Sequence, residues 1–343
     1  MPFDFQKEAW RNFAAGQSGM VNAPTGSGKT YSLLLPIILE GKFKNVKANA
    51  GLQAIWITPI RALSKEIFQA SEKALFGLAS EWSVQTRTGD TAQKVKTQQK
   101  KKLPEILITT PESLHILLAT KGYPNLFKNL KTVVVDEWHE LLGSKRGVLV
   151  ELALSRLRGM NPALRTWGIS ATIGNMEESL EVLLGETLKR QNHAFIRANI
   201  SKKMEVVSVL PDDVETLPWA GHLGIRLLEK VVPIIMASKS TLIFTNTRSQ
   251  AEIWFQRLLE VAPDLAGIMA MHHGSISKDL RGWVEDALYD GRLKAVVCTS
   301  SLDLGVDFRP VESIIQIGSP KGVARFMQRA GRSGHRPGET SRI

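Results

Sequence analysis

Short runs rich in valine and isoleucine recur along the whole chain, and segments with helical periodicity separate them. In the first half the runs cover residues 54–58, 106–109, 132–135 and 167–170, and in the second half residues 206–209, 241–245, 268–271, 295–298 and 313–317. Strands that are apolar on both faces and alternate with helices are typical of a parallel sheet covered by helices on both sides. There are too many runs for one doubly wound sheet, so the pattern predicts two α/β domains in tandem.

We place the boundary between the predicted domains near residues 198–203, where the apolar periodicity breaks. The first domain is then predicted to cover residues 1–200 and the second residues 201–343. A polar segment, PDDVETLP at residues 211–218, is predicted to be a loop inside the second domain.

The balance of charges narrows the kinds of partner. The chain holds 44 Lys and Arg against 33 Asp and Glu, a formal net charge of +11. Such an excess favours a polyanion, either nucleic acid or an anionic membrane surface. The longest strongly apolar stretch, residues 33–39, is too short to span a bilayer and contains a proline, so we expect nucleic acid.

The opening residues lack the apolar core of a signal peptide, and the single cysteine, Cys298, excludes an internal disulfide. We therefore expect a soluble, cytoplasmic protein.

The strongest local signal is the sequence APTGSGKT at residues 23–30. A short apolar strand precedes it and a helical run follows it, which is the context of a phosphate-binding loop. Glycines let backbone N–H groups curl around phosphates, and the N-terminus of the following helix adds positive potential. The loop departs from the strict pattern in having Ala23 where a glycine is usual. The predicted phosphate-binding residues are Pro24, Thr25, Gly26, Ser27, Gly28, Lys29 and Thr30, and the Thr30 hydroxyl is also a predicted Mg²⁺ ligand.

A second motif, Asp-Glu-Trp-His at residues 136–139, follows the apolar run 132–135 directly. A carboxylate after a buried parallel strand lies at the ligand-binding edge of the sheet. Asp136 is predicted to hold Mg²⁺, and Glu137 to orient and deprotonate the attacking water. An acidic pair after a strand is by itself usually a solvated turn. Together with the phosphate loop it predicts hydrolysis of a nucleoside triphosphate.

The remaining motifs narrow the class. In chain order they are Gln6, TPIRAL at 58–63, TGD at 88–90, TPES at 110–113, SAT at 170–172, FTNTR at 244–248, HHGS at 272–275, TSSLDLGVD at 299–307 and QRAGRSG at 328–334. The whole set resembles the core of a superfamily 2 helicase in order and spacing. More narrowly, DEWHELLGSKRG, PWAGHLG, FTNTRSQAEIW and VVCTSSLDLGVDF are similar to the large helicase-related (Lhr-type) group. The sequence is most similar to the bacterial ligase-associated DEXH-box branch of that group.

The resemblance implies two tandem RecA-like domains, each a parallel sheet covered by helices, with the ATP site in the cleft between them. It also implies roles for single residues around that site. Gln6 reads the adenine edge, Lys29 contacts the β- and γ-phosphates, and Arg332 is an arginine finger on the transferring phosphate. The other implied contacts are Gln328 and Arg329 at the same interface, Asp307 at the ribose, and His139, Ser170 and Thr172 as residues that couple the nucleotide to domain closure. His335 stands where many such helicases have an arginine, and the sequence leaves open whether His335, the following Arg336 or neither assists Arg332.

The resemblance further implies a nucleic-acid track across both domains. Its implied residues are Arg61, Gly89, Thr110 and Glu112 in the first domain and Asn246, Arg248, His273, Ser275 and Thr299 in the second. Small hydroxyl residues and backbone amides suit phosphate and sugar contacts, so we expect little base specificity and strong salt dependence. A lysine cluster follows the TGD motif, and the sequence leaves open whether it is a solvated helix face or a DNA contact. Its members are Lys94, Lys96, Lys100, Lys101 and Lys102.

Three functions follow from these observations. The branch resemblance favours an ATP-driven 3′→5′ helicase or translocase that acts on single-stranded DNA or a tailed duplex in repair, with ATP and Mg²⁺ as cofactors. It also implies association with DNA ligase or nuclease repair proteins. The alternatives are an RNA or DNA–RNA hybrid helicase and a non-hydrolysing clamp, against which the intact Lys29 and Glu137 argue. Members of the resembled group continue into further C-terminal domains, so we expect this sequence to be part of a longer protein.

Overall fold

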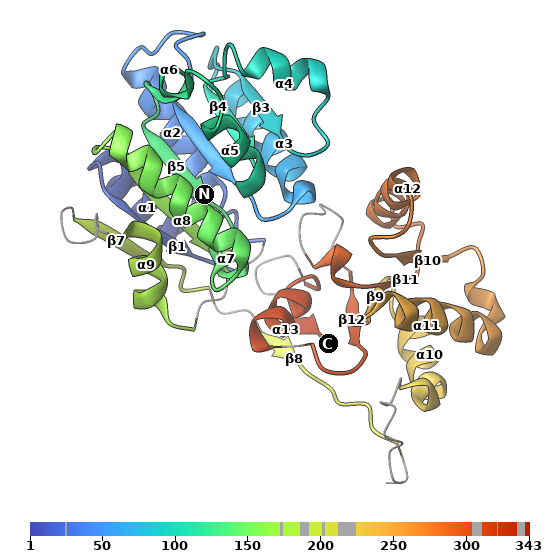
Figure 1. The fold of residues 1–343 in the computed structure, drawn as a ribbon. Coiled ribbons are helices and arrows are strands. Elements are labelled where there is room, and N and C mark those ends of the chain that lie inside the picture. The colour runs from blue at the N-terminus through green and yellow to red at the C-terminus, as the bar shows by residue number, and fades with distance from the viewer. Residues whose placement is uncertain are drawn as a thin grey trace. The chain divides into compact units, whose positions relative to one another are not determined.

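The computed structural model describes residues 1–24, 26–171, 174–185, 192–200, 203–211, 224–303, 311–320, 322–334 and 340–343. The chain forms two compact units, Met1–Ile200 and Ser201–Ile343, which we describe one at a time (Figure 1). No helix in the described part of the chain has the length and apolar character needed to cross a membrane.

In the first unit, the described strands form one parallel sheet of seven strands in the order β3-β4-β2-β5-β6-β1-β7. The strands are β1 (Ser18–Asn22), β2 (Ala54–Ile57), β3 (Val84–Arg87), β4 (Ile106–Thr109), β5 (Thr132–Val135), β6 (Arg165–Ser170) and β7 (His193–Arg197). The helices are α1 (Asp4–Ala14), α2 (Tyr31–Phe43), α3 (Arg61–Gly77), α4 (Gln93–Gln99), α5 (Pro111–Leu118), α6 (Tyr123–Phe127), α7 (Trp138–Leu141), α8 (Lys145–Met160) and α9 (Met176–Leu184).

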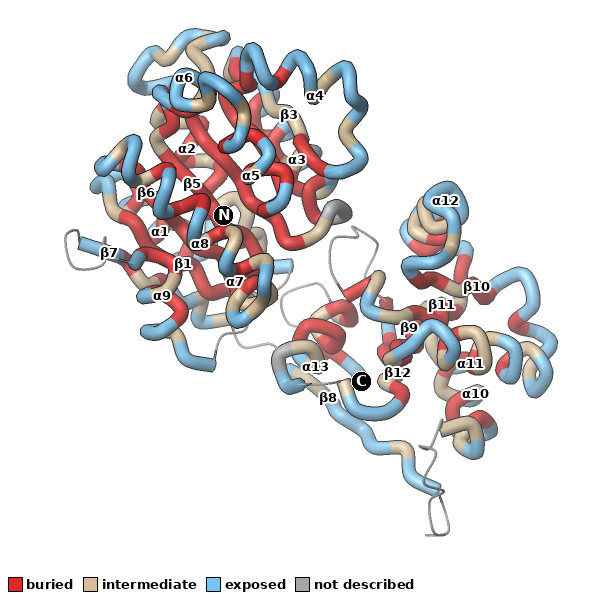
Figure 2. The backbone as a smooth tube through the Cα atoms, in the orientation of Figure 1, coloured by how far each residue is buried: buried red, intermediate tan, exposed pale blue. Residues whose placement is uncertain are grey.

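Both faces of this sheet are buried, which explains why its central strands are continuously apolar. Along β2, Trp56 packs with Leu33 of α2 on one face. Ile55 and Ile57 point to the other face and pack with Leu114 of α5. Figure 2 shows the inner strands as an almost unbroken buried layer.

In the second unit, the described strands include a parallel sheet of four in the order β10-β11-β9-β12. The strands of this unit are β8 (Met204–Glu205), β9 (Thr241–Phe244), β10 (Met269–His272), β11 (Ala295–Cys298), β12 (Ser313–Gln316) and β13 (Ser341–Arg342), of which β8 and β13 pair with each other. The helices are α10 (Leu228–Ala237), α11 (Arg248–Val261), α12 (Lys278–Tyr289) and α13 (Val323–Ala330), with short 3-10 helices η2 (Ile225–Leu227), η3 (Pro263–Leu265) and η4 (Ser300–Leu302).

The predicted fold class, two parallel sheets covered by helices, is confirmed. The predicted strand at residues 206–209 is wrong, because the strand in that region, β8, ends at Glu205. Val206 and Val207 are more than half exposed, and the Val207 N–H donates to the Ile343 carbonyl at 2.9 Å without a strand forming there. The predicted loop at 211–218 lies, apart from Pro211, outside the described residues.

Candidate nucleotide and nucleic-acid sites

The phosphate loop follows β1 and leads into α2, as the sequence predicts. Gly28 has a φ of 72°, a backbone conformation that other residues rarely adopt. A side chain at this position would also meet the amide of Gln6, whose Nε2 donates to the Gly28 carbonyl at 3.0 Å. Gln6 is therefore attached to the phosphate loop itself. Ser27 closes the turn by donating to the Pro24 carbonyl, and Thr25 lies outside the described residues.

Lys29 and Glu137 form a buried ion pair with 2.5 Å between Nζ and Oε1. Their side chains are 11% and 4% exposed, so the pair is shielded from water. Glu137 has a φ of 43°, which is unusual for a residue with a side chain and marks strained backbone. The two residues that the sequence assigns to phosphate binding and water activation thus meet in one unit, although 108 positions separate them.

Asp136 lies beside this pair at the carboxyl end of β5 and is 2% exposed. Trp56 Nε1 donates to its Oδ2 at 3.0 Å, and the Glu137 N–H donates to its Oδ1 at 2.8 Å. Burial and then the charge of Glu137 raise the pKa of Asp136 to about 7, against the opposing effect of Lys29. A cation bound here would favour the ionised carboxylate.

His139 connects the acidic motif to β6. Its Nδ1 lies 2.8 Å from Ser170 Oγ and 3.5 Å from Glu137 Oε2. Burial lowers the pKa of His139, so the ring is neutral at pH 7. The Ser170 carbonyl accepts from the N–H of Ala23 at 3.0 Å, at the start of the phosphate loop. Two of the three predicted coupling residues therefore touch the nucleotide motifs, and the third, Thr172, lies outside the described residues.

The order of the strands divides the carboxyl edge of the first sheet into two halves. The nucleotide motifs follow β5, β6 and β1, which are neighbours. The predicted nucleic-acid residues follow β2, β4 and β3, which are also neighbours. They are Arg61 at the start of α3, Thr110 and Glu112 at the start of α5, and Gly89 after β3. Because the strands are parallel, all these loops lie at the same edge.

Glu112 is held by an arginine that the sequence interpretation does not assign. Arg146 Nε and Nη2 donate to the Glu112 carboxylate at 2.5 and 3.0 Å, and Arg146 Nη1 donates to the Pro59 carbonyl. Burial alone would raise the pKa of Glu112, but the bonds from Arg146 outweigh it and lower the pKa. Arg146 thus ties together two segments of the predicted track. It lies in the GSKRG segment, where only the family resemblance points to it.

The lysine cluster begins on α4 and adjoins this half of the edge. Lys96 Nζ donates to the carbonyl of Gly89 at 2.9 Å, and Lys102 Nζ donates to Asn49 Oδ1 at 2.6 Å. Lys94, Lys100 and Lys101 are exposed. The cluster therefore lies beside a predicted nucleic-acid loop while most of its charge faces solvent.

In the second unit, three neighbouring strands again end at predicted nucleic-acid residues. Asn246 follows β9, Thr299 follows β11, and His273 and Ser275 follow β10. His273 is only 4% exposed, and its Nδ1 accepts from the Ser275 N–H. Arg248, the first residue of α11, is more exposed and pairs with Glu252 at 2.7 Å.

The arginine-rich motif of the second unit departs in one respect from the predicted roles. Arg332 and Gln328 are 5% and 3% exposed, and Nε2 of Gln328 has no hydrogen-bond partner within the described residues. Arg329, which the sequence assigns to the nucleotide, is instead turned into the unit and bonded to Asp303. Asp307, His335 and Arg336 lie outside the described residues.

A comparison with protein families gives the class of the chain. The DEAD/DEAH box helicase model matches residues 3–179, and the helicase conserved C-terminal domain model matches residues 225–337. Since the first match covers more than half of the chain, the chain belongs to the DEAD/DEAH box helicase family.

Similar proteins narrow the assignment within this family. ATP-dependent helicase Lhr-Core protein 2 of Thermococcus barophilus is 37% identical over 95% of this chain and 40% of that protein, and Lhr-Core of Sulfolobus acidocaldarius is 37% identical over 98% and 40%. The structure of Mycobacterium smegmatis helicase Lhr bound to ssDNA and AMP-PNP matches all of this chain and 45% of that one, at 32% identity and a TM-score of 0.82. The resemblance to Lhr-type superfamily 2 helicases is confirmed, and both curated relatives are named as ATP-dependent helicases. The chain spans about 40% of the length of these curated relatives.

Arg146 gives a first prediction. Replacing it by alanine should raise the Kd for a single-stranded oligonucleotide about fivefold, because Glu112 and the loop of Pro59 lose their common anchor. This factor corresponds to about 1 kcal/mol. Fluorescence anisotropy at fixed salt measures it.

A matched control for this prediction is Arg156→Ala. Arg156 lies on the same helix but stacks on the Tyr123 ring, away from the track. Both variants lose one positive charge, so a general electrostatic effect would change them equally. Equal Kd values for the two variants would count against the role of Arg146.

Proposed function

We propose that this chain is the motor core of a 3′→5′ DNA helicase, which hydrolyses ATP to move along single-stranded DNA. The observation that supports it most is the buried contact between Lys29 and Glu137 beside Asp136. A phosphate-binding lysine, a water-activating carboxylate and a metal-binding carboxylate are the groups that phosphoryl transfer to water requires. DNA as substrate is supported by the ssDNA that the similar Mycobacterium smegmatis helicase holds.

The ion pair between Lys29 and Glu137 suggests how ATP binding would release Glu137 for catalysis. A triphosphate in the loop would compete with Glu137 for the Lys29 ammonium, because both are anionic. Once Lys29 turns to the phosphates, the Glu137 carboxylate is available to accept a proton from water. His139, held by Ser170, would keep that carboxylate oriented.

The donor set also fits Mg²⁺. Asp136 offers a carboxylate fixed by Trp56, and Thr30 stands at the N-terminus of α2. Mg²⁺ prefers such oxygen ligands, and when bound it would neutralise charge on the β- and γ-phosphates. Closure of the second unit on the first, with Arg332 completing the site, is part of the same proposal, as is a domain boundary near residue 200.

The test is an ATPase assay with single-stranded DNA and RNA of equal length and sequence. We expect DNA to stimulate hydrolysis several-fold more than RNA, and duplexes with a 3′ tail to be unwound in preference to duplexes with a 5′ tail. Stronger stimulation by RNA would favour the alternative RNA helicase, and no hydrolysis under any condition would favour a clamp. A role in DNA repair, action on DNA–RNA hybrids and association with ligase or nuclease proteins stay predictions from the sequence.

A further inference from the structure

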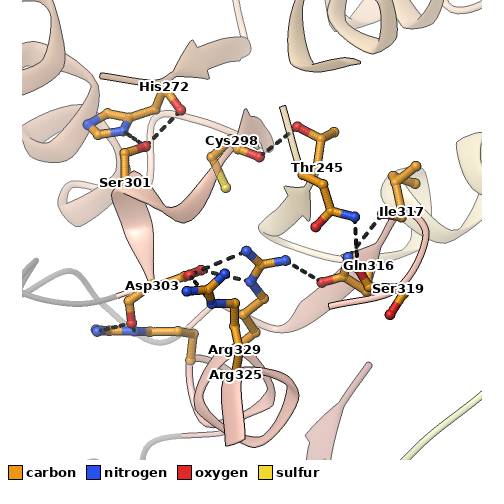
Figure 3. A network of polar contacts seen from close by, with 12 residues as sticks. Thr245, His272, Cys298, Ser301, Asp303, Gln316, Ile317, Ser319, Arg325 and Arg329 are labelled. Carbon is orange, nitrogen blue, oxygen red and sulfur yellow. Dashed lines mark hydrogen bonds and ion pairs between the residues drawn. The ribbon is translucent and has the colours of Figure 1, made fainter. Parts of the chain in front are cut away.

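The carboxylate of Asp303 lies at the centre of a buried polar network in the second unit (Figure 3). Asp303 follows η4, and its side chain is 6% exposed. Its two oxygens accept from Nε and Nη2 of Arg329 at 2.7 and 3.3 Å, and Arg325 Nε lies 3.5 Å from Oδ2. A bidentate pair such as that of Arg329 and Asp303 is among the stronger charge-assisted contacts, and it compensates the burial of both charges.

The backbone carbonyl of the same residue holds the predicted arginine finger. Arg332 Nε and Nη2 donate to the Asp303 carbonyl at 3.1 and 2.7 Å. Asp303 therefore contacts two arginines of one motif in two different ways. Its side chain binds Arg329 on α13, and its main chain binds Arg332 just after that helix.

Arg329 is itself fixed to the sheet. It is 1% exposed, its Nη1 donates to Gln316 Oε1 on β12 at 2.6 Å, and its guanidinium lies 4.6 Å from the centre of the Phe244 ring on β9. All of these contacts leave Arg329 facing inward. Its charge is thus available to anchor Asp303 and not to meet a ligand.

The same network reaches residues of the predicted nucleic-acid track. Asn246 Nδ2 donates to the Ser319 carbonyl at 2.7 Å, and Gln316 Nε2 donates to the carbonyls of Ile317 and Gly318. A run of hydrogen bonds and backbone therefore leads from Asn246 through Gln316 and Arg329 to Asp303. Motion at the nucleic-acid end has a physical route to the residue that holds Arg332.

We propose that Asp303 is a positioning residue for ATP hydrolysis: its charge, bound to Arg329, fixes the carbonyl that orients Arg332. The inference rests on the proposed function, in which Arg332 stabilises the transferring phosphate. Without the carboxylate charge, the buried Arg329 guanidinium would lose its compensation and the Asp303 carbonyl would shift. The effect should fall on kcat, because Arg332 acts mainly in the transition state.

A double-mutant cycle tests this inference. Steady-state kcat and KM for ATP are measured at saturating single-stranded DNA for the wild-type chain, Asp303→Asn, Arg332→Ala and the double variant, with labelled phosphate release to follow slow rates. We expect Asp303→Asn to lower kcat about tenfold and to change KM less than about twofold. In the Arg332→Ala background the same substitution should have almost no effect, since residues that act as a unit are not additive.

The control is Asp264→Asn, which removes a carboxylate from an exposed position of η3 in the same unit and should leave kcat unchanged. Effects of Asp303→Asn and Arg332→Ala that simply multiply would overturn the positioning role but leave the proposed function intact. An unchanged kcat in Arg332→Ala would instead overturn the proposed role of Arg332 at the transferring phosphate, and this inference with it.

A second variant, Asp303→Glu, keeps the inference testable if Asp303→Asn does not fold. Asp303→Glu keeps the charge beside Arg329 but moves it by one methylene, so it should fold and lose less of kcat than Asp303→Asn. Thermal unfolding monitored by circular dichroism establishes that each variant folds. If Asp303→Asn does not, the cycle is run with Asp303→Glu, whose smaller loss should again vanish when Arg332 is absent. A loss that persists in that background contradicts the inference.

Discussion

Replacing Glu137 by glutamine is expected to lower kcat for ATP hydrolysis by about 10²-fold or more, which is the usual contribution of a positioned base. The amide still hydrogen-bonds to water, but it cannot accept the proton. It also loses the charge that pairs with Lys29, so ATP should bind at least as well as before. Steady-state hydrolysis and equilibrium binding of a fluorescent ATP analogue measure the two effects separately.

Glu177→Gln is the matched control for this substitution, because Glu177 is an exposed glutamate in the first turn of α9. It should change neither quantity. Near-normal turnover in Glu137→Gln would show that another group activates the water.

Replacing Arg332 by alanine is expected to slow hydrolysis about 10³-fold, the contribution of an arginine finger in comparable enzymes. Its charge is needed most as the γ-phosphate leaves, so the KM for ATP should change much less than kcat. Arg257→Ala, on the exposed surface of α11, removes the same charge from the same unit and should have no effect. A loss of nucleotide affinity with unchanged kcat would make Arg332 a binding residue and contradict its role as a finger.

The central strands could be predicted from the sequence because burial on both faces makes them continuously apolar. The sequence pattern does not predict β3 and β7, because these strands form the two edges of the sheet and carry polar residues. The sequence of β3, for example, is Val-Gln-Thr-Arg. The run 206–209 has the composition of a strand, but it lies beyond the end of β8 and its first two valines are more than half exposed. Composition therefore identifies strands only where the tertiary fold supplies a partner.

The nucleotide motifs could be predicted because strand, loop and helix are contiguous in the chain. The contacts of Trp56 with Asp136, of Arg146 with Glu112 and of Arg329 with Asp303 could not. Each joins segments brought together by strand order or helix packing, which no local pattern encodes. For Arg329 the motif gives the residue type needed but not the direction in which the side chain turns.

The divided edge of the first sheet has a consequence for the two ligands that we propose for it. Both ligands are polyanions. The loops predicted to bind them follow neighbouring strands about 5 Å apart at β2 and β5, and strands roughly 15 Å apart away from that boundary. The Debye length at physiological salt is about 8 Å, so phosphates on the two halves are only partly screened from each other. A nucleotide and a nucleic acid on this unit would therefore repel each other, and the cations along the edge, Lys29 and Lys96 among them, would offset that repulsion.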